Sequence, residues 1–243
     1  MTDGLEPIAL VTGAGHGIGL EVCRQLAGLG WTVVLTARGL DRAREAAAAI
    51  GETLGKIHPR ALDVSVDASA RALAADLGWA LGRVDVLVNN AAAPGDWSET
   101  AGTADLRAAH AAFEANFFGP WRVIQAFLPL LRRSRRARIV NVSSGAGSYT
   151  DAEFGLATNP GAVSYSASKA ALNALTVKLA LELLEERILV NAVCPGLTAT
   201  GPWVEEPGAR PVEQGAASVV WAAMLEDGGP TGGLFRDGRV LGW

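Results

Sequence analysis

Short apolar runs alternate with longer amphipathic stretches along nearly the whole chain, and this alternation constrains the fold more than any other feature. Parallel strands joined by helices produce such a pattern, because strands covered by helices on both faces are apolar almost throughout. The sequence therefore predicts a doubly wound α/β fold, with a parallel sheet and helices on both faces. The expected strands are residues 8–12, 32–36, 57–62, 84–89, 138–143 and 189–193.

Length and composition favour one domain. The 243 residues are 49% hydrophobic and 19% charged, which is enough to build one sizeable core. No internal repeat or low-complexity linker divides the chain, so we expect residues 1–243 to form a single domain. A last helix over 212–225 and a short apolar segment at Leu234 and Phe235 are expected to close the sheet, which would then have about seven strands.

Charge and cysteine content exclude several classes of protein. A net charge of −4 provides no basic face for non-specific binding to nucleic acid or an anionic membrane. No run reaches the ~18 apolar residues of a membrane span, and the N-terminal residues do not resemble a signal peptide. Cys23 and Cys194 lack the spacing of a metal site or disulfide framework. We therefore expect a cytoplasmic protein without a metal.

Five arginines between residues 132 and 138 are the exception to the acidic balance. They follow a long helical pattern and precede the apolar Ile139 and Val140. We interpret them as the solvated end of a helix, where cations complement the helix dipole, rather than as a phosphate-binding patch.

A glycine-rich turn follows the first expected strand. Residues 12–19 read TGAGHGIG, and a helical pattern over 20–29 follows directly. Glycine permits positive φ and close approach of the backbone, and a helix N-terminus presents free N–H groups to phosphate. The pattern predicts the pyrophosphate site of a dinucleotide, although a tight turn without a ligand is the alternative. The expected contacts are Gly13, Gly15, His16, Gly17, Ile18 and Gly19.

The end of the second expected strand indicates which dinucleotide is preferred. An acid at this point would hydrogen-bond the ribose 2′-OH of NADH, whereas a base would pair with the 2′-phosphate of NADPH. The segment reads LTAR, so Arg38 offers a guanidinium suited to phosphate. Asp41 lies further on and is interpreted as the cap of the next helix. The sequence therefore favours NADPH.

Tyr165 and Lys169 lie four residues apart in the stretch SYSASK. On a helix such residues share one face, which would bring the ammonium group within reach of the phenol. A free phenol has a pKa near ~10, and a close cation lowers it by about one to three units, toward the range useful for general acid catalysis. The pair is interpreted as a proton donor and its activator. A partly buried tyrosine beside a solvated lysine is the alternative.

Six short motifs in a fixed order resemble the short-chain dehydrogenase/reductase family across almost the whole chain. They are residues 12–19, Asn89-Asn90-Ala91, Asn116, Asn141-Val142-Ser143-Ser144, Tyr165 with Lys169, and Pro195-Gly196. The C-terminal stretch from 211 to 238 is similar to the NADPH-dependent carbonyl reductase branch. This resemblance implies a Rossmann fold and hydride transfer from NADPH to a ketone or aldehyde carbonyl.

The resemblance also implies roles for individual residues. Tyr165 would protonate the carbonyl oxygen, and Lys169 would hold the nicotinamide ribose and lower the phenol pKa. Ser144 would hydrogen-bond the same oxygen, stabilising charge that grows in the transition state. Asn116 would position a water that relays protons to Lys169.

Further cofactor contacts are implied by the same resemblance. Asp63 and Val64 correspond to contacts with adenine, Asn90 and Ala91 to the wall beside the adenosine ribose, and residues 195–200 to the segment along the nicotinamide. Either Thr198 or Thr200 could bond the carboxamide or a phosphate, and the sequence leaves this choice open. The contacts expected in that last segment are Pro195, Gly196, Thr198 and Thr200.

The chain departs from the family pattern around the expected substrate site. Ala92 stands where the family usually has glycine, and its methyl group is expected to narrow the pocket. The loop 145–164 is longer than usual, so Phe154 is expected to line the substrate site. The segment 201–210 is short, which removes most of the usual lid. Trp203 is expected either to stack on the substrate or to cover apolar surface.

The helix expected over 163–184 is apolar or small on nearly every face, which indicates burial on more than one side. We therefore expect a homo-oligomer, a dimer or tetramer, with a monomer as the alternative. Two other functions stay open: an NAD-dependent alcohol dehydrogenase, and a non-catalytic NADPH-binding sensor. A serine hydrolase is excluded, because Ser143 and Ser144 lack the GxSxG pattern.

Overall fold

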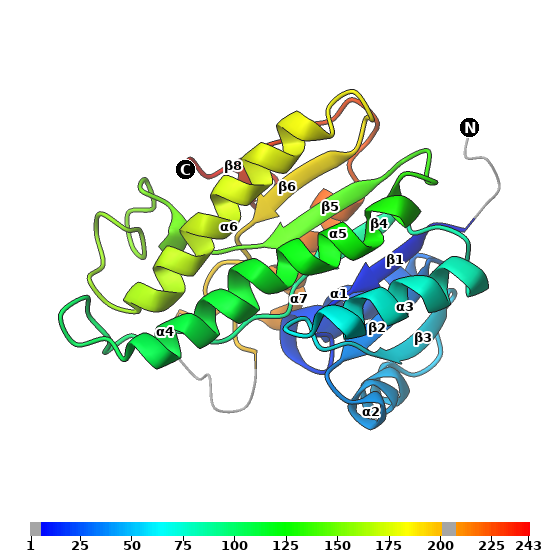
Figure 1. Ribbon diagram of the computed structural model, residues 1–243, viewed down its shortest axis with the longest axis horizontal. Coiled ribbons are helices and arrows are strands. Elements are labelled where there is room, and N and C mark those ends of the chain that lie inside the picture. The colour runs from blue at the N-terminus through cyan, green and yellow to red at the C-terminus, as the bar shows by residue number, and fades with distance from the viewer. Residues whose placement is uncertain (1–5, 201–207) are drawn as a thin grey trace.

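The structure, a computed structural model, describes residues 6–200 and 208–243. It contains one sheet with the strand order β3-β2-β1-β4-β5-β6-β7-β8, in which every pair is parallel except β7 and β8 (Figure 1). The strands are β1 (Ile8–Val11), β2 (Thr32–Ala37), β3 (Lys56–Ala61), β4 (Val86–Asn89), β5 (Arg138–Val142), β6 (Leu189–Val193), β7 (Leu234–Arg236) and β8 (Arg239–Val240). The predicted doubly wound α/β fold is confirmed.

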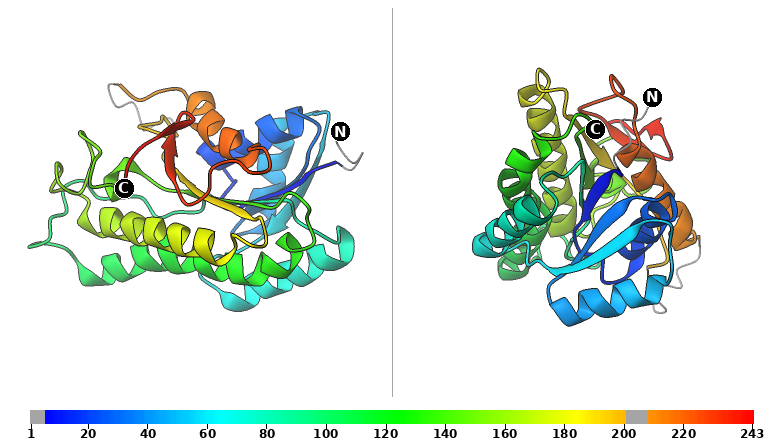
Figure 2. Two further views of the ribbon diagram at one scale, coloured as in Figure 1. Left: turned by 90° about the horizontal axis from the view of Figure 1, so that it is seen from above. Right: turned by 90° about the vertical axis from the view of Figure 1, so that its right-hand side faces the viewer.

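The helices form two layers, one on each face of the sheet (Figure 2). Apolar residues of α1, α2 and α7 pack on one face, and those of α3, α5 and α6 pack on the other. α4 packs against α6. The helices are α1 (Gly17–Gly28), α2 (Leu40–Ile50), α3 (Asp67–Ala80), α4 (Leu106–Phe113), the π-helix η1 (Glu114–Phe118), α5 (Gly119–Leu131), the 3₁₀ turn η2 (Gly145–Gly147), α6 (Val163–Glu182) and α7 (Val212–Ala223).

Strand burial follows position in the sheet. The residues of β1, β2, β4, β5 and β6 are all buried, as their continuous apolar runs predict. β3 is an edge strand and is only partly buried, which agrees with Pro59, because proline is tolerated at an edge where its missing N–H is not needed. The strand order reverses between β1 and β4, and ligands of such sheets bind at the carboxyl ends of the strands beside this reversal.

The eighth strand was not among the about seven expected from the sequence. β8 is short and pairs with β7 across a turn at Asp237 and Gly238, where φ is 52° and 73°. Positive φ at both positions matches a tight hairpin turn, for which Asp-Gly is a favoured sequence. The Asp237-Gly238 dipeptide was therefore the sequence signal for this hairpin, although the hairpin was not predicted.

Two local interpretations are wrong. Asp41 does not cap α2: the helix begins at Leu40 with Gly39 as its cap, and Asp41 lies in the first turn beside Arg44. Arg138 does not belong to a solvated helix end, because it is a buried residue of β5 whose guanidinium donates to the carbonyl of Leu225 and to Asp227. The charge pattern placed it on the surface, but strand pairing brings it inside.

None of the helices in the described part of the chain is long and apolar enough to cross a membrane.

Candidate active site

The glycine turn lies between β1 and the N-terminus of α1, beside the reversal of strand order. Gly13 and Gly17 have φ of 63° and 58°, which other residues rarely adopt. A Cβ at Gly13 would lie 2.6 Å from Cα of Ala91, and a Cβ at Gly19 would collide with the amide of Asn90. Glycine at these positions therefore lets the turn pack closely against the segment after β4, and a strand, a glycine turn and a helix N-terminus in this order fit the pyrophosphate of a dinucleotide.

Thr12 connects this turn to the end of β4. Its buried hydroxyl oxygen accepts hydrogen bonds from the backbone N–H groups of Asn90 and Ala91, each at 3.0 Å. The Asn90 amide donates in return to the carbonyls of Thr12 and Gly13, at 2.9 and 3.1 Å. Asn90 thus holds the turn in shape. Thr12 was not among the predicted site residues, although it is the first residue of the glycine motif.

Two arginines follow the end of β2. Arg38 is exposed directly after the strand, and its charge contributes, after the hydrogen bonds from Ser65, to holding the pKa of Asp63 below its usual value. Arg42, in the first turn of α2, lies beside the glycine turn: a Cβ at Gly15 would lie 3.2 Å from its Cγ and 3.3 Å from its Nε. Arg42 was not among the predicted cofactor contacts, because its place beside Gly15 comes from the packing of α2 rather than from a local sequence pattern.

Of the predicted adenine contacts, Asp63 and Val64 follow β3 at the same end of the sheet. Asp63 accepts hydrogen bonds from the N–H and hydroxyl of Ser65 at 3.0 and 2.6 Å. The Val64 carbonyl accepts from Arg122 at 2.7 Å. His16 is exposed at the start of α1, and Ile18 is half-buried in its first turn. Their expected contacts with the cofactor stay predictions.

Tyr165 and Lys169 lie on α6, with Ser144 at the end of β5. The Lys169 ammonium lies 5.6 Å from the centre of the Tyr165 ring and donates a hydrogen bond to the Val142 carbonyl at 2.8 Å. Burial lowers the pKa of Lys169 to about 8. Burial likewise raises the pKa of Tyr165 to about 12, although the hydroxyl of Ser144 acts in the opposite direction.

These values differ from the expectation that Lys169 would lower the phenol pKa. The pair lies on α6 with the ammonium near the ring as predicted, but burial is the main cause of both pKa shifts. Tyr165 therefore keeps its proton at neutral pH in this structure. A phenol in that state can act as a proton donor.

Asn116 is fully buried in the π-helix η1, which interrupts the passage from α4 to α5. Its side-chain oxygen accepts from the N–H of Ala93 at 2.7 Å, and its amide donates to the hydroxyl of Ser168 at 3.0 Å. Ser168 in turn donates to the carbonyl of Tyr165 at 2.6 Å. Asn116 is thus connected to the helix that carries the tyrosine. Its expected water relay to Lys169 stays a prediction.

The segment after β6 places the two threonines differently. The Thr198 hydroxyl donates to the carbonyls of Pro195 and Gly196, and a Cβ at Gly215 would lie 2.6 Å from it, so it faces the protein interior. Thr200 instead lies over the glycine turn, where a Cβ at Gly17 would come within 3.2 Å of its Cβ. Thr200 is therefore the threonine beside the proposed phosphate site.

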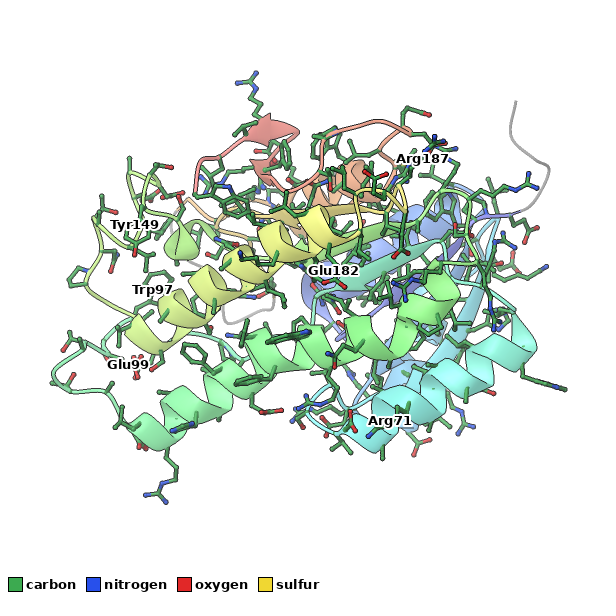
Figure 3. All side chains as sticks on the ribbon, turned by 45° about the horizontal axis from the view of Figure 1, so that its top comes forward. Arg71, Trp97, Glu99, Tyr149, Glu182 and Arg187 are labelled. Carbon is green, nitrogen blue, oxygen red and sulfur yellow. The ribbon has the colours of Figure 1, made fainter. Side chains whose placement is uncertain are left out.

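The loop after β4 and the loop before α6 meet at the N-terminal end of α6. Figure 3 shows Glu99 near the start of α6, with Trp97 and then Tyr149 further along the same side of the molecule. The rings of Trp97 and Phe154 form an edge-to-face pair at 5.7 Å. The Glu99 carboxylate accepts from the N–H and hydroxyl of Ser164 at 2.9 and 2.7 Å, in the first turn of α6. Neither Trp97 nor Glu99 was predicted, because each has its partner more than 50 residues away.

Other expected substrate residues have different outcomes. Ala92 is exposed at the start of the loop after β4, and a Cβ at the nearby Gly95 would lie 3.1 Å from Cβ of Tyr165. Ala92 is therefore close in sequence to a segment that covers the tyrosine. Trp203 lies outside the described residues. Within residues 6–200 and 208–243, no group of His, Cys, Asp or Glu side chains could hold a metal ion.

Comparison with known proteins identifies the family. Residues 7–207 match the family described as short chain dehydrogenase. The chain is 34% identical to (+)-neomenthol dehydrogenase of Arabidopsis thaliana over 284 aligned residues, which cover 93% of this chain and 94% of that protein.

Solved structures of similar fold point to the same family. NADPH-bound carbonyl reductase from chicken fatty liver aligns with a TM-score of 0.84 and 28% identity, covering 98% of this chain and 100% of that one. A metagenomic short-chain oxidoreductase in complex with NADP aligns with a TM-score of 0.77 and 32% identity. The alignment covers 95% of this chain and 96% of that one. With the glycine turn and the Ser144, Tyr165 and Lys169 group in place, this protein belongs to the short-chain dehydrogenase/reductase family of oxidoreductases.

Proposed function

We propose that the protein transfers a hydride from NADPH to the carbonyl group of a ketone or aldehyde. The observation that carries this proposal is the grouping of Ser144, Tyr165 and the buried Lys169 at the end of the sheet where the glycine turn lies. The reductases and NADP-bound structures among its relatives support the same direction. The chemistry that a bound nicotinamide cofactor supplies is the hydride itself.

The side chains divide the remaining work. Tyr165 donates its proton to the carbonyl oxygen, and a pKa raised to about 12 by burial keeps that proton in place until it is needed. Ser144 donates a hydrogen bond to the same oxygen and stabilises its developing negative charge. Lys169 holds the nicotinamide ribose. A water positioned by Asn116 passes a proton from solvent to Lys169, which replaces the proton lost by Tyr165. A protonated phenol is the form that carbonyl reduction requires of its proton donor.

The choice of NADPH rests on the two arginines that follow β2. Arg38 and Arg42 both offer planar guanidinium groups for a 2′-phosphate, and Arg42 lies against Gly15. The segment from Leu35 to Arg38 contains no acid to bind the 2′-OH of NADH. Thr200, which lies over Gly17, is proposed to contact the cofactor.

The decisive test replaces Tyr165 by phenylalanine and follows NADPH oxidation with a panel of ketones and aldehydes. Loss of the proton donor is expected to lower kcat by about 10²–10⁴-fold, with NADPH affinity retained. Tyr149→Phe is the matched control, since Tyr149 is the other tyrosine of the chain and is exposed. If Tyr165→Phe turns over as fast as the control does, another group supplies the proton. If wild type binds NADPH but reduces no carbonyl of the panel, and Tyr165→Phe changes nothing, the protein is a cofactor sensor.

A further inference from the structure

A buried ion pair connects the loop before α6 to the C-terminal hairpin. Asp151 has a side chain only 2% exposed, and its carboxylate accepts from the guanidinium of Arg236 on β7 at 2.6 Å. The same carboxylate accepts from the backbone N–H groups of Glu153 and Phe154 at 3.1 and 2.9 Å. One side chain of the loop is therefore held by a residue 85 positions further along the chain.

The pair lies directly behind the turn that follows Ser144. A Cβ at Gly145 would lie 2.6 Å from the Arg236 guanidinium and would collide with the Asp151 carboxylate. The sulfur of Cys194 accepts from the Gly145 N–H at 3.1 Å and from Arg236 at 3.2 Å. Arg236 thus contacts both Asp151 and Cys194 underneath the backbone that carries Ser144.

The same hairpin supports the loop at another point. The hydroxyl of Ser148 donates to the carbonyl of Gly242 at 2.9 Å and accepts from the N–H of Asp151 at 3.2 Å. Phe154, whose N–H is bound to Asp151, packs edge-to-face on Trp97 from the opposite loop. A continuous set of contacts therefore runs from the C-terminal hairpin, through the loop, to the aromatic pair.

We propose that Arg236 is a positioning residue that, through Asp151 and Cys194, fixes Ser144 and Phe154 in the geometry needed for carbonyl reduction. This inference rests on the function proposed above. The hydrogen bond from the Ser144 hydroxyl to the carbonyl oxygen stabilises the transition state only if the hydroxyl is correctly positioned. A displacement of about 1 Å at a reacting centre can cost ~100-fold in rate. Loss of Arg236 leaves the buried Asp151 carboxylate without its cation, whereas the side chain of Arg236 itself is 29% exposed. Both groups lie against Gly145, the residue after Ser144, so we expect the disturbance to reach Ser144.

The test uses Arg236→Gln, Arg236→Lys and Asp151→Asn in the full-length protein. Arg236→Gln and Asp151→Asn are expected to lower kcat by about 10–100-fold, with the KM for NADPH unchanged. The double variant should be no slower than the slower single variant, because both act through one interaction. Arg236→Lys should be intermediate, since an ammonium keeps the charge but lacks the fork that reaches two acceptors. Arg239→Gln and Glu153→Gln, exposed on β8 and on the same loop, are the controls and should match wild type.

Hydrogen exchange of the Gly145, Glu153 and Phe154 amides provides a second readout that needs no turnover. Faster exchange in Arg236→Gln than in Arg239→Gln supports the tether. The inference would be overturned if the kcat of Arg236→Gln or Asp151→Asn equals that of the controls, or if the two losses of kcat multiply in the double variant. Amide exchange in Arg236→Gln that is no faster than in Arg239→Gln would also overturn it. If wild type itself reduces no carbonyl, the proposed function is wrong, and so is the catalytic role inferred for Arg236. Amide hydrogen exchange would still show whether Arg236 holds the loop.

Discussion

At the scale of single residues, burial controls the two groups expected to do the chemistry. The same environment shifts the two pKa values in opposite directions: exclusion of water lowers the pKa of Lys169 and raises that of Tyr165. Each shift favours the neutral form. The protein therefore holds a lysine whose positive charge is disfavoured before the cofactor binds, which is a cost to stability at neutral pH.

Lys169→Met is expected to stabilise the cofactor-free protein while abolishing activity. The folded-state pKa of about 8 lies below the ordinary 10.5, so the folded protein loses this proton first and its stability rises as pH rises between the two values. The advantage of Lys169→Met should be roughly 3 kcal/mol at pH 7, which is the free energy of this pKa shift, and should shrink toward pH 10. Urea unfolding of both proteins at pH 7, 8, 9 and 10 measures it. A difference that grows with pH would contradict this account.

Arg38 and Arg42 are expected to set the preference for NADPH. Arg38→Gln and Arg42→Gln should each weaken NADPH binding by about 10–100-fold, because each removes a charged hydrogen bond to the 2′-phosphate, and should leave NADH binding unchanged. Fluorescence titration with both cofactors gives the Kd values. Arg44→Gln is the control, since Arg44 lies on the same helix and pairs with Asp41. Equal losses for NADPH and NADH would show that neither arginine meets the phosphate.

At the scale of elements, the site is assembled from segments that end at the same edge of the sheet. The glycine turn follows β1, Asn90 follows β4, and Ser144 follows β5. Parallel strands place such residues together without further design. The loops above them are less regular, and their order depends on contacts such as Glu99 with the first turn of α6.

Trp97 and Phe154 are expected to select substrates by size. Replacing either by alanine opens the space between the two loops, so kcat/KM for bulky ketones should rise relative to that for small ones by about tenfold, with NADPH affinity retained. Kinetics over a graded ketone series measure the ratio. Trp79→Ala is the control, since Trp79 is 90% exposed on α3. An unchanged ratio in both variants would place the substrate elsewhere.

At the scale of the whole molecule, several large apolar side chains of η1, α5 and the end of α6 are exposed. Phe118 of η1 and Trp121 of α5 are 45% and 38% exposed, and Leu181 and Leu184, at the end of α6 and just after it, are exposed as well. α5 and α6 run side by side on one face of the sheet (Figure 1). Because large exposed apolar groups often mark interfaces, we propose that this helical face takes part in a homo-oligomer.

Light scattering after gel filtration is expected to give a dimer or tetramer for the wild type. Trp121→Glu should shift the mass toward the monomer, because a buried unpaired carboxylate destabilises an interface. Leu54→Glu is the control, since Leu54 is 86% exposed on the segment between α2 and β3. A monomeric wild type would refute the proposed assembly.

The amino-acid sequence by itself determined the order of strands and helices, the glycine turn, and the motif residues Ser144, Tyr165 and Lys169. These features depend on periodicity and on neighbours a few positions apart, which any single chain displays. The tertiary structure alone decided that Thr200 rather than Thr198 lies over the glycine turn and that Arg42 lies beside Gly15. It also decided the directions in which the pKa values of Tyr165 and Lys169 shift, and the pairing of Asp151 with Arg236. Burial and contacts between distant segments arise only when the sheet is assembled, so no local pattern encodes them.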